Sequence, residues 1–236
     1  MDFRAISSLR LYLTLKIVGT YHRLTGKGVI PKEYFRSFLP ERPVVLEAGA
    51  HKGVDTVELA KMWPDGTIHA FEPVPEIFKK LVKNTRNCNN VLCYQLALGN
   101  VKGSDEMYIS TGASDGSSSL LPPKKHLEMF PTVYFDEKIQ VSIVTLDDWA
   151  RENNITAIDF LWLDLQGMEL KVLQSGCSIL KTVKAIYSEV SSIEGYEHQN
   201  LYSELRDWLE KEGFHVEREA VENGEGNVFF LRNSEK

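Results

Sequence analysis

The chain of 236 residues has only three cysteines, Cys88, Cys93 and Cys177, which are irregularly spaced and far from any matching pair of histidines. This argues against a disulfide framework and a zinc site, and it favours a reducing, cytoplasmic environment. Positive charge is also in deficit, because 27 Lys and Arg face 33 Asp and Glu. No basic face is available for a phosphate backbone, so we expect no nucleic-acid partner.

Long hydrophobic runs are missing as well. The most apolar stretch near the start, residues 9–18, is interrupted by Arg10 and Lys16 and is too short to span a bilayer. The first residues also lack the cleavage pattern of a signal peptide. We therefore expect no transmembrane segment.

Residues 2–25 carry two competing periodicities. Alternating apolar residues between positions 9 and 17 fit a strand, whereas a second set has the spacing of an amphipathic helix: Ile6, Leu9, Leu13 and Ile17. We favour the helix, docked on the core or on a second copy as a homodimer contact, over a helix lying on a membrane surface.

Three prolines, at positions 31, 40 and 43, follow as a linker. The predicted organisation is an N-terminal helical extension, residues 1–40, and one main domain, residues 41–236. The chain is 43% hydrophobic, which is enough for one sizeable core.

From residue 43 onward, short apolar runs alternate with amphipathic stretches, which is typical of β–α–β units and a largely parallel sheet. The expected strands are 44–48, 67–71, 91–95, 139–144, 158–163 and 183–189, with a closing pair at 214–219 and 227–231. Helices are expected at 54–62, 75–85, after Thr145, at 168–174 and at 201–212. Residues 100–138, rich in Gly, Pro and Ser, are expected to form loop and short antiparallel strand.

The end of the first expected strand carries a candidate ligand-binding turn. Glu47 is followed by Gly49 and Gly53, which let the backbone turn sharply and approach a ligand in front of a helix N-terminus. A dinucleotide fingerprint needs three glycines and no acid beside the pyrophosphate. Glu47 would instead attract the ammonium and sulfonium of S-adenosylmethionine, so the charges favour that cofactor over NAD.

Further acids stand at other strand ends. Glu72 follows the second expected strand, at an offset from Gly49 typical of an acid that accepts hydrogen bonds from ribose hydroxyls. Asp164 and Glu189 end two later strands. Since ligands of open α/β sheets bind beyond the carboxyl ends of the strands, we expect these acids to converge with Glu47 on one crevice.

Together these residues resemble the FkbM family of S-adenosylmethionine-dependent methyltransferases, over about four fifths of the chain. The resemblance is carried by residues 47–53 with Thr56, by 69–73, 97–99, 118–120 and 144–147, and by 159–164 with Gly167 and Glu169. It implies a Rossmann-like, seven-stranded class I methyltransferase fold, α/β with a mostly parallel sheet and an antiparallel closing strand. It also implies O-methylation, often of a sugar hydroxyl in a glycan or natural product, with S-adenosylhomocysteine as the second product.

Four positions depart from the pattern that the family usually shows. Glu47 stands where Asp is common, His51 where Asn is, Trp162 where Lys is and Gln166 where Glu is. The last two flank Asp164, so the resemblance does not determine the acceptor. The expected cofactor-binding residues are Glu47, Ala48, Gly49, His51, Gly53, Thr56, Glu72, Pro73, Ala97, Ser118, Ser119 and Asp164.

Methyl transfer to a hydroxyl benefits from a positioned base, and the candidates, in order, are Asp164, Glu189 and His198. His198 lies in a polar run that fits an exposed loop better than a base, whereas for His51 a place on the pocket rim and a hydrogen bond to the backbone at a helix start fit equally well. Trp149 and Trp208 are expected in the core. No metal ligand is assigned; clustered carboxylates leave Mg²⁺ possible, but no motif supports it.

Three other functions remain open on the sequence. A nicotinamide-dependent oxidoreductase is disfavoured by the missing third glycine and by the acid at position 47. A catalytically silent cofactor-binding module would fit the altered residues around Asp164. Methylation of a protein or a small amine is compatible with the same fold.

Overall fold

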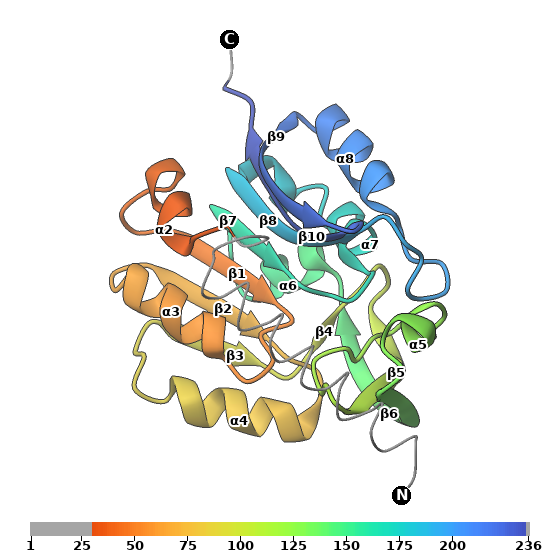
Figure 1. Ribbon diagram of the computed structural model, residues 1–236. Coiled ribbons are helices and arrows are strands. Elements are labelled where there is room, and N and C mark those ends of the chain that lie inside the picture. Colours follow the sequence, from red (N-terminus) through yellow and green to blue (C-terminus); the bar gives the residue numbers. More distant parts are fainter. Residues whose placement is uncertain (1–29, 235–236) are drawn as a thin grey trace, which may run out of the picture.

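The computed structural model describes residues 30–234 and folds around a seven-stranded sheet (Figure 1). The strand order is β3-β2-β1-β7-β8-β10-β9. The strands are β1 (Val44–Ala48), β2 (Thr67–Phe71), β3 (Val91–Tyr94), β7 (Phe160–Leu163), β8 (Ala185–Ser191), β9 (Phe214–Glu222) and β10 (Glu225–Arg232). The five strands from β3 to β8 are parallel, and β10 runs antiparallel to both β8 and β9. The predicted α/β fold with an antiparallel closing strand is confirmed.

Helices cover both faces of this sheet. One face carries α2 (Lys32–Phe35), α3 (Val54–Met62) and α4 (Pro75–Thr85), and the other carries α6 (Leu146–Glu152), α7 (Glu169–Gln174) and α8 (Tyr202–Lys211). Because both faces are buried, the central strands are nearly continuous apolar runs, which is what the sequence pattern predicted. Thr145 caps α6 as expected, its hydroxyl accepting the N–H of Asp148.

The aromatic packing on the two faces differs. Phe35 of α2 is fully buried against Phe160, Trp162, Tyr187 and Phe229. On the opposite face, Trp149 is buried in the core as predicted, and Trp208 packs against that core while half-buried.

A second sheet of three strands corrects the expectation for residues 100–138. It consists of β4 (Ala97–Leu98), β6 (Val133–Val144) and β5 (Gly103–Gly112), with β5 antiparallel to β6. The expected loop is present between β5 and β6, but the antiparallel strands are longer than expected, because Gly103 and Gly112 stand at the two ends of β5 and do not interrupt it. A short helix, α5 (His126–Met129), connects the same region.

Residues 30–40 also differ from the expected linker. They contain α2 and the 3-10 turn η1 (Arg36–Phe38), and their buried side chains, Ile30 and Phe35, belong to the core. The expected amphipathic helix at residues 2–25 lies outside the described residues, and the division at residue 40 stays a prediction. Within residues 30–234, none of the helices has the length and apolar character that a membrane crossing requires.

Candidate active site

The site lies where the sheet changes direction. The chain leaves β1 toward β2 and β3 on one side, and returns to pair β7 with the other edge of β1. Such a switch point leaves a crevice beyond the carboxyl ends of the two strands. The turn at Gly49, the acid Glu72 and the acid Asp164 follow directly after β1, β2 and β7.

The turn after β1 depends on the missing side chain of Gly49. Gly49 has φ +85°, and a Cβ placed on it would lie 1.9 Å from the backbone oxygen of Asp164. The N–H groups of Gly49 and Ala50 both donate to the carbonyl of Phe71, and the N–H of Asp164 donates to the carbonyl of Ala48. The three strand ends are therefore locked together by backbone contacts that only glycine permits at this position.

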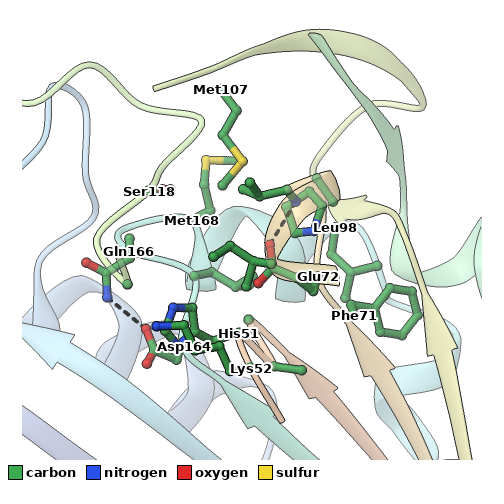
Figure 2. A pocket seen from close by; sticks show the side chains of 18 of the residues that line it. His51, Lys52, Phe71, Glu72, Leu98, Met107, Ser118, Asp164, Gln166 and Met168 are labelled. Carbon is green, nitrogen blue, oxygen red and sulfur yellow. Dashed lines mark hydrogen bonds between the residues drawn. The ribbon is translucent and has the colours of Figure 1, made fainter. Parts of the chain in front are cut away.

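A cavity of about 180 Å³ opens at these strand ends. Its wall includes seven of the expected cofactor-binding residues: Gly49, His51, Glu72, Pro73, Ala97, Ser118 and Asp164. Figure 2 shows Glu72 between Leu98 and Phe71 on one side and the Asp164–Gln166 pair on the other. Apolar residues, among them Ile77, Leu98 and Met107, line the same cavity, so it combines an apolar region with a polar one.

The Glu72 carboxyl is held in the cavity wall by the backbone. One of its oxygens, Oε1, accepts the N–H of Val74 at 2.7 Å, and the residue is buried. Burial raises the pKa of Glu72 to about 7, although backbone hydrogen bonds from Val74 and His51 act in the other direction. The carboxyl is thus fixed in position at the N-terminus of α4.

The other five expected cofactor-binding residues do not line this cavity: Glu47, Ala48, Gly53, Thr56 and Ser119. Glu47 is buried within β1, and its Oε2 has no hydrogen-bond partner among the described residues. Burial raises the pKa of Glu47 to about 8. Gly53, at φ +78°, is the N-cap of α3. Glu47, Ala48, Gly53 and Thr56 thus belong to β1, to the turn after it and to α3, whereas Ser119 lies in the loop after β5, where its hydroxyl donates to the carbonyl of Gln166.

A loop after β5 crosses the cavity and is tied to the turn after β1. Asp115 in this loop lies 2.6 Å from Lys52 Nζ and 3.1 Å from His51 Nε2. Partial burial alone would raise the pKa of Asp115. The hydrogen bond from Lys52 and the neighbouring positive charges outweigh it and hold the pKa of Asp115 below its usual value. His51, on the cavity rim as expected, thus bonds a side chain and not the helix start.

A second cavity, of about 300 Å³, adjoins the first and shares Gly116, Asp164 and Gln166 with it. Glu189, the second candidate base, lines this cavity. Its wall also includes polar and aromatic residues, among them Ser117, His126, Phe130, Ser191, Tyr196 and Asn200, beside aliphatic ones such as Leu170 and Val190. Asp164 therefore stands at the boundary between two spaces that two ligands could occupy side by side.

Gln166 links the carboxyls of Asp164 and Glu189. Its Nε2 donates to Asp164 Oδ1 at 2.7 Å and to Glu189 Oε2 at 2.6 Å, while the Tyr196 hydroxyl lies 3.0 Å from its Oε1. Burial raises the pKa of both acids, and for Glu189 the charge of Asp164 adds to the rise. Gln166 has φ +51°, an uncommon conformation for a residue with a side chain.

His198, the third candidate base, lies on an exposed loop and lines neither cavity. Its N–H donates to Glu194, and its carbonyl accepts from Lys171. The structure thus places two of the three candidate bases together and the third apart from them.

Sequence reasoning missed several residues of the two walls, chiefly Met107, Asp115, His126, Met168 and Tyr196. The Gly- and Ser-rich composition around Asp115 pointed to a loop, but nothing in the sequence singled out the aspartate itself. Within residues 30–234, no cluster of three or more His, Cys, Asp or Glu side chains is arranged to hold a metal ion. The structure thus adds no support for Mg²⁺.

Comparison with known proteins agrees with this fold. The sequence model of the methyltransferase FkbM domain matches residues 47–216. The 2-O-methyltransferase NoeI of Sinorhizobium fredii is 30% identical, over 81% of this chain and 80% of its own length. Methyltransferase sdnD of Sordaria araneosa is 26% identical, over 94% of this chain and 89% of its own length.

Two solved structures share the fold. An FkbM methyltransferase from Methylobacillus flagellatus superposes with a TM-score of 0.54 at 14% identity, covering 84% of this chain and 46% of that one. The Methanococcus jannaschii fibrillarin pre-rRNA processing protein superposes with a TM-score of 0.51 at 13% identity, over 84% of this chain and 70% of that one. The fold is thus that of a Rossmann-like methyltransferase. The chain belongs to the FkbM methyltransferase family.

Proposed function

We propose that this protein uses S-adenosylmethionine to O-methylate a hydroxyl of a sugar, glycan or natural product. The observation that carries the proposal is the pair of adjoining cavities that meet at Asp164, one suited to the cofactor and one to the acceptor. The likeness to a relative named as a 2-O-methyltransferase supports the choice of oxygen as the methylated atom.

The first cavity fits the proposed cofactor in its distribution of polar and apolar groups. Glu72 offers a fixed carboxyl to a ribose diol, and the apolar residues Ala97, Leu98 and Met107 suit an adenine ring. At the turn, Gly49 presents only backbone, because a side chain there would overlap the backbone of Asp164. The wall is also acidic, with Asp55, Glu72, Asp115 and Asp164, which favours a cationic sulfonium over a pyrophosphate.

When bound, S-adenosylmethionine supplies a methyl group activated by a positively charged sulfur. The chain contributes alignment of the acceptor, which accounts for a large part of the rate enhancement in reactions of this kind. Asp164 lies where the acceptor space meets the cofactor space, so it faces both.

We assign the general base to the carboxyl pair of Asp164 and Glu189. Both groups are buried, and the Gln166 amide donates to each of them, so the two carboxyls titrate as an interacting pair. One ionised carboxylate of the pair accepts the proton of the acceptor hydroxyl as the hydroxyl oxygen gains the methyl group. A positioned base of this kind contributes roughly 10²–10⁴-fold in rate. The Gln166 amide orients both carboxyls toward the boundary.

The remaining expectations about partners belong to the same proposal. The acidic net charge supports a protein that acts on small molecules or glycans and not on nucleic acid, and the three irregularly spaced cysteines support a place in the cytoplasm. A homodimer through the helix expected at residues 2–25 stays a prediction, because that segment lies outside the described residues.

The test is to incubate extract of the producing cells with the purified protein and isotopically labelled S-adenosylmethionine, then to identify labelled products by mass spectrometry. We expect label on a hydroxyl oxygen of a sugar-containing compound, and none with the Asp164→Asn variant. Cofactor binding without label transfer to any extract component would contradict the proposal.

A further inference from the structure

The charged side chains in the wall of the second cavity are all acidic. Its ionisable acids are Asp164, Glu169, Glu189 and Glu225, and no lysine or arginine of the described chain lines it. Two lysines lie close in sequence to residues of this wall but are engaged elsewhere: Lys124 pairs with Glu194, and Lys171 donates to the carbonyl of His198. A ligand in this cavity therefore meets acids and neutral groups.

The acids of this wall are not equivalent. Glu169 accepts the N–H groups of Leu165 and Gly167 and so belongs to the backbone turn before α7. Asp164 and Glu189 share the Gln166 amide, and burial raises the pKa of each. Together with the neutral side chains of Ser191 and Asn200, these carboxyls give the wall both hydrogen-bond donors and acceptors, as the hydroxyls of a polyol require.

His126 supplies an independent observation. It lines the second cavity, it is only 6% exposed, and its Nδ1 has no hydrogen-bond partner among the described residues. Burial lowers the pKa of His126, which favours the neutral ring over a positively charged one. A buried polar atom without a partner is costly unless a ligand satisfies it.

The rings around His126 define a face for a ligand. Phe130 and Tyr196 lie with their ring centroids 4.9 and 5.2 Å from that of His126, and both also line the cavity. Aromatic faces beside polar atoms suit a ring that has apolar C–H surfaces and hydroxyl edges.

From these observations we infer that the second cavity is the acceptor site and that it takes a polyhydroxylated, sugar-like ring without phosphate or carboxylate, with a hydroxyl bonded to His126 Nδ1. This rests on the proposed function, since it assigns the acceptor of the same reaction. An anionic group would be desolvated beside Asp164 and Glu189 with no cation of the described wall to compensate it, which is why such acceptors are excluded.

The test measures binding of free monosaccharides by saturation-transfer NMR to the full-length protein saturated with S-adenosylhomocysteine. The probes are matched pairs: glucose with glucuronate, galactose with galacturonate, and mannose with mannuronate. We expect at least one neutral sugar to bind and its acid to bind at least about 10-fold more weakly, since like charges in a poorly solvated site repel strongly.

Two variants assign the effect to named residues. His126→Phe keeps an aromatic ring but removes Nδ1. We expect it to weaken binding of the neutral sugar roughly 5- to 10-fold, which corresponds to the loss of one hydrogen bond. Asn200→Lys places a cation in the same wall, and we expect it to let the acid bind. The matched control is Asn100→Lys, which adds the same charge at an exposed position outside the cavity.

The outcomes separate this inference from the proposed function. If S-adenosylhomocysteine itself does not bind, the proposed function fails and the acceptor assignment falls with it. If it binds, but no neutral sugar does, or the acid binds the unmodified protein as well as its neutral partner, the acceptor assignment alone is overturned. An unchanged neutral-sugar affinity in His126→Phe, with S-adenosylhomocysteine binding intact, overturns the role of His126.

Discussion

Gly49 and Asp164 are in direct backbone contact, although 115 positions separate them: a Cβ on Gly49 would lie 1.9 Å from the Asp164 carbonyl oxygen. This contact joins the turn after β1 to the end of β7. It fixes the position of the Asp164 side chain relative to the cavity floor, so the geometry of the proposed base depends on a residue without a side chain.

Gly49→Ala is therefore expected to destabilise the fold strongly. The positive φ alone costs an alanine about 1–2 kcal/mol, and the overlap with Asp164 adds about 1–3 kcal/mol. Gly213→Ala is the matched control, because Gly213 has the same φ of +85° but a Cβ there meets only Arg232 Nη1 at 3.8 Å. Urea denaturation should show a clearly larger loss for Gly49→Ala; equal losses would mean that the contact is not tight.

Glu47 is expected to make stability decrease as pH rises. Its pKa is about 8 in the folded protein against 4.5 for the free side chain, so between these values the folded state holds a proton that the unfolded chain has released. The free energy of unfolding therefore falls by up to about 1.4 kcal/mol per pH unit through this group. Other buried carboxyls act in the same direction, so the share of Glu47 must be isolated by a variant.

Glu47→Gln isolates it. We expect the free energy of unfolding of the variant, relative to that of the unmodified protein, to rise by about 2–4 kcal/mol between pH 5 and pH 8, as measured by urea denaturation without ligand. Glu41→Gln, at an exposed position, serves as the control and should change little. Parallel stability curves for Glu47→Gln and the unmodified protein would show that Glu47 is ionised in the fold.

Gln166→Met tests the link between the two acids. The amide hydrogen bonds favour the ionised carboxyls, so their loss should raise the pKa of the pair, and a higher pH is then needed to form the base. We expect the acid limb of the kcat/KM profile to move up by about one pH unit, with activity recovered at alkaline pH. Gln174→Met, on the exposed side of α7, should leave the profile in place. A lower rate with no shift would reduce Gln166 to a packing role.

The sequence predicted the main sheet well because burial on both faces imposes a strong pattern. The bounds of β1, β2, α3 and α4 agree with the expected ranges, since each strand is a short apolar run next to an amphipathic stretch. The small sheet was missed because β5 is mostly exposed and is bounded by Gly103 and Gly112, so the composition of this segment resembled that of a loop. Its pairing with β6 is decided by contacts distant in sequence.

The site was predictable to the extent that it follows strand ends. Glu72 and Asp164 could be placed in one crevice because parallel strands end at the same edge. His126 and Asp115 could not, since each reaches a cavity from the region between β5 and β6, whose path the pattern does not determine. For Glu47, the identity of the residue pointed to a cavity wall, whereas the alternation of β1 puts its side chain on the same face as Val45, where it is buried under α2 and α3.

The most direct test of the account is calorimetric titration of the full chain with S-adenosylhomocysteine and, separately, with NAD, for the unmodified protein, Glu72→Ala and the exposed control Glu76→Ala. We expect S-adenosylhomocysteine to bind and NAD not to bind. Loss of the Glu72 carboxyl should weaken that binding roughly 10- to 100-fold, because one to two charge-assisted hydrogen bonds are lost, while Glu76→Ala has no effect. Unchanged affinity in Glu72→Ala, or binding of NAD in place of S-adenosylhomocysteine, would contradict the account.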